Sequence, residues 1–331
     1  MLEELRYLVL NTPSSSSSFS LEKKGLGHID IVKKLKQWSQ SAGNALFSSF
    51  HWIVKKEQIK SGTSETTRNN TEYIKNISIH VPKHLKPLND EQLGHYLAGL
   101  IDGDGHFSSQ QQLIIVFNSS DVHLAYYIKK IIGFGQVKKV KLKNAYIYII
   151  SNKEGIIRIL NLINGKLRTL NKFNQVINNI LTHPKFSEEA GEFYINETND
   201  FYNHWIAGFS DADASFQIKI VKRDNKPRPE IRLNFQIDQK DNNILLQIKD
   251  IFGGNIGYRK NQDTYYYGST SFGSAKKVIN YFDNFHLQSS KHNNYLKWRK
   301  AYILIQNSQH LTEIGIEKIC LLKNSMNRNS V

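Results

Sequence analysis

Two short stretches of the chain each end in a pair of aspartates separated by one residue. Asp102 and Asp104 follow one run of apolar and small residues, and Asp211 and Asp213 follow a second run of the same kind. We expect each run to be a short helix, which places the carboxylates at helix C-termini. Carboxylates are unfavourable next to the negative end of a helix dipole unless a cation compensates them. The pattern therefore indicates a divalent metal at each helix end.

The metal that suits these stretches is Mg²⁺. It prefers carboxylate, carbonyl and water oxygens, and the carbonyls of Gly103 and Ala212 lie between the acids. An EF-hand calcium loop is excluded, because His106 and Phe107 stand where that loop requires Asp or Asn and then glycine. A single stretch on its own would favour a solvated helix stop. The repetition of the paired acids in both stretches is therefore what indicates a metal.

The repetition extends beyond the acids. Residues 96–107 align with residues 205–216, and further matches relate residues 121–133 to residues 241–253. Each copy predicts a short helix, a strand pair, a second helix, a second strand pair and closing helices. One half-domain therefore occurs twice.

Small residues mark the same place in both expected motif helices. Ala98 and Gly99 stand together in the first, and Ala207 and Gly208 in the second. Glycine costs a helix about 1 kcal/mol relative to alanine, so its repetition predicts that the two helices pack closely against each other. They would then form the interface between the half-domains.

The expected strands carry one apolar and one polar face. Residues 232–238 alternate throughout, with Leu233, Phe235 and Ile237 toward the core. A solvated surface is the simplest explanation for one such strand. A polar face with lysine, arginine, glutamine, asparagine and tyrosine in both copies also suits phosphate contact and hydrogen bonding to base edges. The predicted nucleic-acid contacts are Lys139, Lys141, Lys143, Tyr146, Lys219, Lys222, Arg228, Arg232, Gln236, Arg259 and Tyr265.

The composition also favours a nucleic-acid partner and excludes other classes of protein. The chain of 331 residues has 44 Lys+Arg against 29 Asp+Glu, a net charge of +15, which favours nucleic acid over a membrane surface. The single cysteine, Cys320, excludes an intramolecular disulfide framework and a cysteine-based zinc site. The sequence contains no apolar stretch of about 18 residues, so we expect no membrane span.

We expect four segments along the chain. Residues 1–90 contain a serine tract and lack sustained periodicity, which predicts a partly disordered N-terminal extension with two helices, one near residues 29–39. Residues 91–186 and residues 201–325 are the expected half-domains. The acidic residues 187–200 between them predict a solvated linker.

The duplicated motif resembles that of the LAGLIDADG homing endonucleases. Residues 97–105 read LAGLIDGDG, which differs in one letter from the motif that names the family. The resemblance covers about three quarters of the chain and is greatest to two-motif proteins encoded in group I introns of fungal mitochondrial genes, some of which act as RNA maturases. It implies an α+β fold, in which two pseudo-symmetric αββαββα half-domains pack through the motif helices and two antiparallel sheets form a DNA-binding saddle.

The resemblance also implies roles for individual residues. Asp104 and Asp213 would bind Mg²⁺ at the scissile phosphates, with the carbonyls of their motifs nearby. The family places a lysine and often a glutamine near the attacking water, and Lys291 and Gln239 fit these settings in the second half.

The first half departs from the family pattern. Lys172 fits the lysine position only with one extra residue, and no glutamine follows Phe117 at the matching distance. In the second motif, Ala214 replaces the glycine that follows the last acid. Such departures predict that one strand is cut slowly or not at all. An alternative role for Lys172 and Lys291 is simple phosphate contact.

The sequence thus predicts a monomeric, sequence-specific double-strand DNA endonuclease that depends on Mg²⁺, is encoded in a group I intron and works in the mitochondrial matrix. The alternative is an RNA maturase that binds its own intron RNA, with or without retained DNA cleavage. A DNA-binding regulator that has lost cleavage is a third possibility. The two retained terminal acids argue against it, because acids without a metal would repel DNA.

Overall fold

The computed structural model describes residues 76–187, 191–224 and 228–326. The predicted helix near residues 29–39, most of the N-terminal extension and residues 188–190 of the predicted linker lie outside this part. Among the described residues, no helix is long and apolar enough to cross a membrane.

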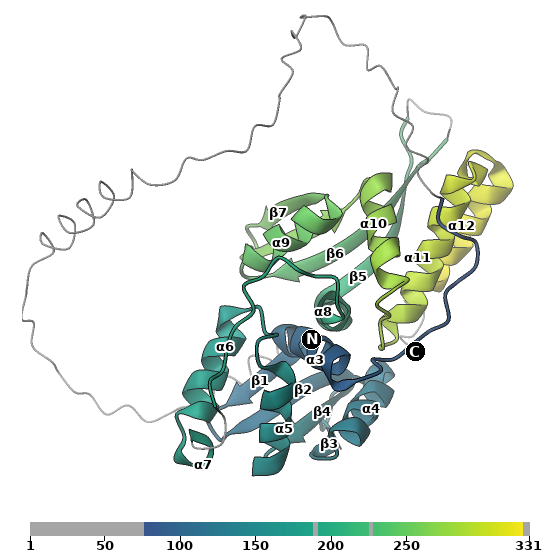
Figure 1. Cartoon of the computed structure of the whole chain (residues 1–331). Helices are drawn as coiled ribbons and strands as arrows, with labels where there is room; N and C mark the ends of the chain where they lie inside the picture. Colours follow the sequence, from purple (N-terminus) through teal and green to yellow (C-terminus); the bar gives the residue numbers. More distant parts are fainter. Residues whose placement is uncertain (1–75, 188–190, 225–227, 327–331) are drawn as a thin grey trace, which may run out of the picture. The chain divides into compact units, whose positions relative to one another are not determined.

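The first half-domain follows the predicted αββαββα order and continues into further helical turns (Figure 1). Its elements are α3 (Asp90–Asp104), β1 (Gly105–Ser108), β2 (Gln112–Asn118), η1 (Ser119–Asp121), α4 (Val122–Ile132), β3 (Gln136–Lys139), β4 (Ala145–Ile150), α5 (Lys153–Ile163), α6 (Leu170–Val176), η2 (Ile177–Leu181) and α7 (Pro184–Ser187).

The second half-domain repeats the order and ends in two further helices. Its elements are α8 (Trp205–Asp213), β5 (Ala214–Val221), β6 (Glu230–Gln239), α9 (Asn243–Phe252), β7 (Asn255–Arg259), β8 (Thr264–Ser269), α10 (Phe272–Phe282), α11 (Lys291–Gln306), η3 (Gln309–Leu311) and α12 (Glu313–Ser325). Between α7 and α8, residues 191–204 form no helix or strand.

Each half-domain contains one four-stranded antiparallel sheet. The strand orders are β1-β2-β4-β3 and β5-β6-β8-β7, so the two sheets have the same topology. One face of each sheet packs on helices in a common core, which includes Leu113, Ile115 and Tyr148 of the first sheet and Phe235 and Tyr267 of the second. We call the opposite face of each sheet its outer face. The duplication predicted from sequence is confirmed.

The motif helices α3 and α8 pack directly against each other, as the small residues predicted. A methyl group on Gly99 would lie 2.0 Å from the backbone oxygen of Trp205, and one on Gly208 would lie 1.9 Å from the backbone oxygen of Tyr96. Neither position has room for a Cβ atom, so glycine is required for this close approach. Helix α3 begins with Asn89, whose side chain accepts a hydrogen bond from the backbone N–H of Gln92 (2.9 Å).

The chain immediately before α3 lies against the second half-domain (Figure 1). Arg299 of α11 is 1% exposed, forms an ion pair with Asp283 (2.9 Å) and donates hydrogen bonds to the carbonyls of Ser78 (3.0 Å) and His80 (3.1 Å). Ile77 exchanges two backbone-to-amide hydrogen bonds with the side chain of Gln306. Residues 76–89 are thus attached to the fold, although the predicted extension included them.

Candidate nuclease site

The two motif helices end side by side and bring the motif acids together. Gly103 lies against the end of α8. A methyl group on it would stand 2.3 Å from the Cβ of Ala212 and 3.1 Å from Oδ2 of Asp213. Asp104 is the next residue along α3. Asp104 and Asp213 are therefore neighbours across the helix interface, where β1 and β5 begin.

The first acid of each motif is buried and fully engaged. Asp102 is 4% exposed and accepts hydrogen bonds from the backbone N–H groups of Arg168 (2.8 Å) and Thr169 (3.2 Å) and from the Thr169 hydroxyl (2.6 Å). Asp211 accepts the equivalent bonds from the backbone of Gln288 (2.7 Å) and from the backbone (3.2 Å) and hydroxyl (2.5 Å) of Ser289. These two acids fix the chain segments that precede α6 and α11.

Each buried acid also accepts a hydrogen bond from an aromatic side chain of the other half. The Trp205 indole donates to Asp102 (2.9 Å), and the Tyr96 hydroxyl donates to Asp211 (2.7 Å). Burial raises the pKa of Asp102 to about 6 and also raises that of Asp211, although the donors around each carboxylate oppose the shift. This crossed pair of hydrogen bonds was not predicted from the sequence. Its signal was the alignment of Tyr96 with Trp205 at the start of the repeat.

The second acid of each motif is placed differently. Asp104 and Asp213 are both partly exposed at the helix ends. The side-chain amide of Gln239, at the end of β6, donates a hydrogen bond to Oδ2 of Asp213 (2.7 Å). The structure thus brings together the glutamine and the acid that the family resemblance associated with each other.

Both predicted lysines lie next to the carbonyls at the motif helix ends. The Lys291 ammonium donates hydrogen bonds to the carbonyls of Ala212 (2.7 Å) and Ser210 (3.2 Å), and the Lys172 ammonium donates to the carbonyl of Gly105 (2.5 Å). A cation is favourable at this end of a helix. The Ala212 carbonyl, predicted beside the metal, therefore has an ammonium as its partner in the structure.

The two halves of the site are not equivalent. Thr169 and Ser289 hold the same relation to the buried acids, and Lys291 is two residues beyond Ser289. The corresponding residue of the first half is Asn171, so Lys172 is displaced by one position. Gly105 and Ala214 each follow the last acid of their motif, so they are equivalent positions. Gly105 pairs with Ile115 and Ala214 pairs with Ile237, which makes Ile115 and Ile237 equivalent as well.

The same register places Phe117 where the second half has Gln239. Phe117 is buried and has no amide to offer. His106, on the outer face of β1, is half-buried beside Lys172, and burial together with that ammonium lowers its pKa. The aligned residue of the second half is Ser215. His106 was not among the site residues predicted from the sequence.

The side chains available for a metal are compatible with Mg²⁺. In the part of the chain that the structure describes, no group of three or more histidine, cysteine or acidic side chains could form a closed metal cage. Two partly exposed carboxylates at adjacent helix ends instead match an ion that keeps several waters and binds through one or two carboxylates and substrate phosphates.

The outer face of the second sheet is polar, as predicted. Pairing of Lys219 with Arg232, of Gln217 with Asn234 and of Ser215 with Gln236 places six polar side chains on it. Asp238 accepts hydrogen bonds there from Gln236 (3.0 Å) and Arg259 (2.7 Å). These contacts orient an amide and a guanidinium. Lys222 and Arg228 are exposed beside the β5–β6 turn.

Three predicted contacts lie on the core side of their strands. Tyr265 pairs with Gln239 on the core side of β8 and packs against the core, whereas Tyr266 is on the outer face under the guanidinium of Arg259. In the first sheet, Lys139 pairs with Tyr146, and both are on the core side of the register. The outer side chains of that strand pair are instead Gln136 and Lys138, which pair with Ile149 and Ile147. Lys141 and Lys143 lie in the β3–β4 turn.

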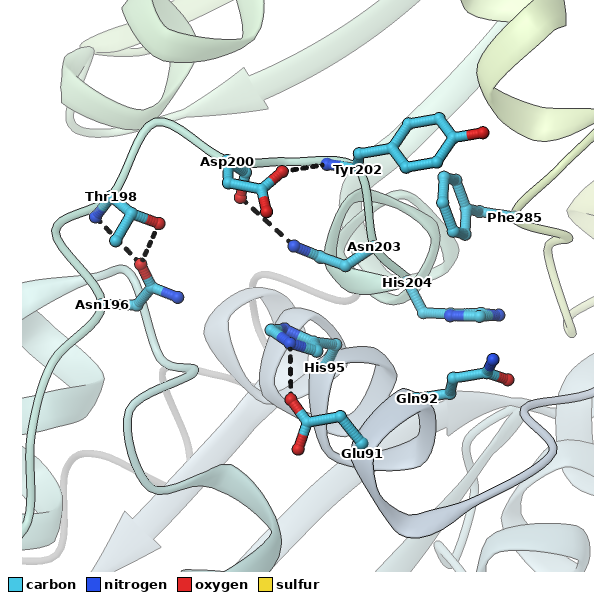
Figure 2. A pocket seen from close by; sticks show the side chains of 10 residues that line it. All are labelled: Glu91, Gln92, His95, Asn196, Thr198, Asp200, Tyr202, Asn203, His204 and Phe285. Carbon is cyan, nitrogen blue, oxygen red and sulfur yellow. Dashed lines mark hydrogen bonds and ion pairs between the residues drawn. The ribbon is translucent and has the colours of Figure 1, made fainter.

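A cavity of about 310 Å³ lies at the other end of the motif helices (Figure 2). Glu91 and His95 of α3 face His204 and Phe285 across it, and polar residues of the segment before α8 complete the wall. The 15 residues of α3 separate this cavity from Asp104, about 20 Å at 1.5 Å per residue. It is therefore not part of the carboxylate site.

The fold and the site together define a protein class. A family model described as LAGLIDADG endonuclease matches residues 97–178 and 206–302. The chain belongs to this family.

Two curated relatives in yeasts cover most of the chain. This chain is 61% identical over 308 residues to an uncharacterized cox1 intron-2 protein of 37.2 kDa from Schizosaccharomyces pombe. The match covers 92% of this chain and 90% of the relative. The intron-encoded DNA endonuclease aI3 of Saccharomyces cerevisiae is 29% identical, over 73% of this chain and 70% of its own length.

A third relative and a solved structure also resemble the chain. The intron-encoded RNA maturase bI4 of Saccharomyces cerevisiae is 30% identical, over 70% of this chain and 37% of its own length. The I-LtrWI LAGLIDADG homing endonuclease bound to target DNA superposes with a TM-score of 0.58 at 22% identity, covering 73% of this chain and 100% of that structure. This likeness confirms the predicted α+β fold.

Proposed function

We propose that this protein is an intron-encoded, sequence-specific endonuclease that cuts both strands of DNA by hydrolysis. The observation that carries the proposal is the position of Asp104 and Asp213, partly exposed and adjacent where two sheets meet a helix pair. Membership of the LAGLIDADG endonuclease family supports it. The DNA endonuclease aI3 and the cox1 intron protein among its relatives support the intron origin and a place in the mitochondrial matrix.

Asp104 and Asp213 are the residues that would hold Mg²⁺. When bound, the ion would activate a water for attack on the phosphate and stabilise the leaving oxygen. A solved structure of the same fold, I-SmaMI, is bound to uncleaved DNA in the presence of calcium ions, which supports a dependence on divalent metal. The buried acids Asp102 and Asp211 hold the helix ends in place and do not take part in the reaction.

Second-half residues supply orientation and charge. Gln239 holds one oxygen of Asp213 and so directs the other toward the site. Lys291 places a positive charge at the end of α8, close to where the phosphate must approach the acids. Such fixed groups favour the negative charge that develops on the phosphate during hydrolysis.

We propose that the protein acts as a monomer and that the outer faces of its two sheets contact DNA. On the second sheet the contacts are Lys219, Arg232, Gln236 and Arg259, flanked by Lys222 and Arg228. On the first half, Lys141 and Lys143 in the β3–β4 turn would contact phosphates. Arginine and glutamine on such a surface form bidentate hydrogen bonds with guanine and adenine in the major groove.

Strand-resolved cleavage tests the proposal. A plasmid carrying the intron-free cox1 exon junction, incubated with the protein and Mg²⁺, should be linearised. Asp104→Asn should abolish cutting by the first half-domain, and Asp213→Asn should abolish cutting by the second. Each variant should still bind the plasmid. Glu317→Gln, which removes one exposed charge from α12, is the matched control and should cut like the parent. A parent protein that binds this junction no better than random DNA and leaves it intact would overturn the proposal.

A second candidate function is assistance in splicing of its own group I intron. The relative named RNA maturase bI4 favours it, and the two activities can coexist in one protein. Splicing of the intron RNA should then be unaffected by Asp104→Asn, because the carboxylate serves only hydrolysis. A splicing rate that is the same with and without the protein would remove this candidate.

A further inference from the structure

The outer face of the first sheet is apolar at its centre. Ile114 pairs with Ile149 and Val116 pairs with Ile147, all on the face opposite the core. We call these four residues the aliphatic strip. Val116 is 9% exposed and the three isoleucines are partly exposed, and none of the four belongs to the buried core cluster. The predicted polar face of this sheet is therefore wrong at its centre.

The second sheet has polar or small residues at the same positions. Alignment of Ile115 with Ile237 sets Ile114 against Gln236 and Val116 against Asp238. The partner strand sets Ile147 against Tyr266 and Ile149 against Gly268. The two half-domains thus present matching surfaces of opposite chemistry.

The surroundings of the aliphatic strip fit a polyanion. Strands β1 to β4 contain no acidic residue. The exposed residues Gln136 and Lys138 pair with Ile149 and Ile147 and so border the strip on its outer side. On the inner side, Ile114 pairs with His106, which is two residues from Asp104. The strip is thus continuous with the proposed cleavage site.

We propose that the aliphatic strip reads thymine methyl groups in one half of the DNA target. The C5-methyl of thymine is the apolar group that base edges display in the major groove, and aliphatic side chains contact it. The amides and guanidinium of the second sheet would read the other half-site by hydrogen bonds. RNA fits the strip poorly, because uracil lacks the methyl and the major groove of A-form RNA is too narrow for side chains.

This inference rests on the proposed endonuclease function, and deoxyuridine substitution tests it separately. Replacing thymine by deoxyuridine removes only the methyl. Binding of the full-length Asp104→Asn, Asp213→Asn protein to the target duplex should weaken about fourfold for each contacted methyl lost from the first half-site. The same change in the second half-site should alter the affinity less than twofold.

Matched variants locate the effect. Ile114→Ser and Ile147→Ser alter side chains outside the core and should abolish the discrimination between thymine and deoxyuridine. Gln236→Ser, at the position equivalent to Ile114, should leave that discrimination unchanged. Equal affinity for thymine and deoxyuridine duplexes, with specific binding retained, overturns the inference but not the endonuclease. Weaker binding of intron RNA, but not of DNA, by Ile147→Ser would assign the strip to RNA. Absence of any specific DNA binding would instead remove the proposed function.

Discussion

The two aspartates of each motif are two residues apart, yet they meet different surroundings. Asp102 is enclosed by two backbone N–H groups, a hydroxyl and an indole, whereas Asp104 is partly exposed where the helix ends. Along a helix end, a step of two residues turns a side chain from the interior to the opposite side. One acid therefore stabilises the fold and the other is available for a metal.

Asp102→Asn and Asp104→Asn should separate these roles. Asp102→Asn replaces one acceptor oxygen with an NH2 donor that faces the N–H and O–H donors already in place, which should lower the free energy of unfolding by about 1–3 kcal/mol. Asp104→Asn should abolish cutting of the strand served by the first half-domain and leave the stability unchanged. Urea denaturation and strand-resolved cleavage of both variants check this. An Asp102→Asn protein as stable as the parent would contradict the structural role.

His204 makes stability depend on pH. It is 9% exposed, and burial, followed by the nearby His95 and His286, lowers its pKa to about 4. An unfolded chain would protonate this imidazole near pH 6.5. Because the unfolded state binds more protons, the His204 contribution to the free energy of unfolding is intact above pH 6.5 and is lost as pH falls toward 4.

His204→Gln should flatten that dependence. Asp102, with a pKa raised to about 6, contributes in the opposite direction over an overlapping range, so the comparison must be made between parent and variant. Denaturation at a series of pH values from 7 to 4 provides the measurement. A variant with the same pH profile as the parent would exclude His204 as a source.

At the scale of elements, the features that local sequence patterns determine could be predicted from the sequence. The motif helices and the polar face of β6 follow from glycine placement and strict alternation. Strand β4 reads AYIYII and is apolar on both faces, so periodicity could not decide which side chains face the core. Tyr146 was therefore placed outward, whereas Ile147 and Ile149 hold that position.

Other features of these elements have no local sequence pattern from which they could be predicted. The attachment of residues 76–80 depends on carbonyls of the chain that meet Arg299, and every residue type carries a carbonyl. The crossed bonds from Tyr96 and Trp205 join residues over a hundred positions apart in sequence. Such contacts follow from packing of the whole fold, and no local spacing encodes them.

The helix pair provides a stability prediction. In Gly208→Ala the new methyl would meet the backbone of α3 at 1.9 Å, and backbone cannot rotate aside as a side chain can. The helices must separate, which should cost about 3 kcal/mol. Gly273→Ala is the matched control, because no atom lies within 4 Å of its added methyl in helix α10. It should be neutral or stabilise by up to about 1 kcal/mol. Similar losses in both variants would contradict the close packing.

At the scale of the whole molecule, duplication has produced two unequal halves. The second half combines Asp213, Gln239 and a lysine bonded at the helix end. The first half has Phe117 in place of the glutamine, and its lysine is displaced by one position. Since each half is proposed to cut one strand, the inequality should appear as a difference in rate between strands.

We expect the strand served by Asp213 to be cut about tenfold faster than the other strand. This is less than the rate enhancement that a positioned proton-transfer group usually contributes. Nicked plasmid should then accumulate before linear plasmid. Lys291→Met should slow the faster strand and leave the other unchanged, whereas Lys172→Met should act only on the slower strand. Duplexes labelled at either 5′ end measure both rates in one reaction. Equal rates in the parent would contradict this prediction. They would show that the first half is fully active with Lys172 in its displaced position and without the glutamine.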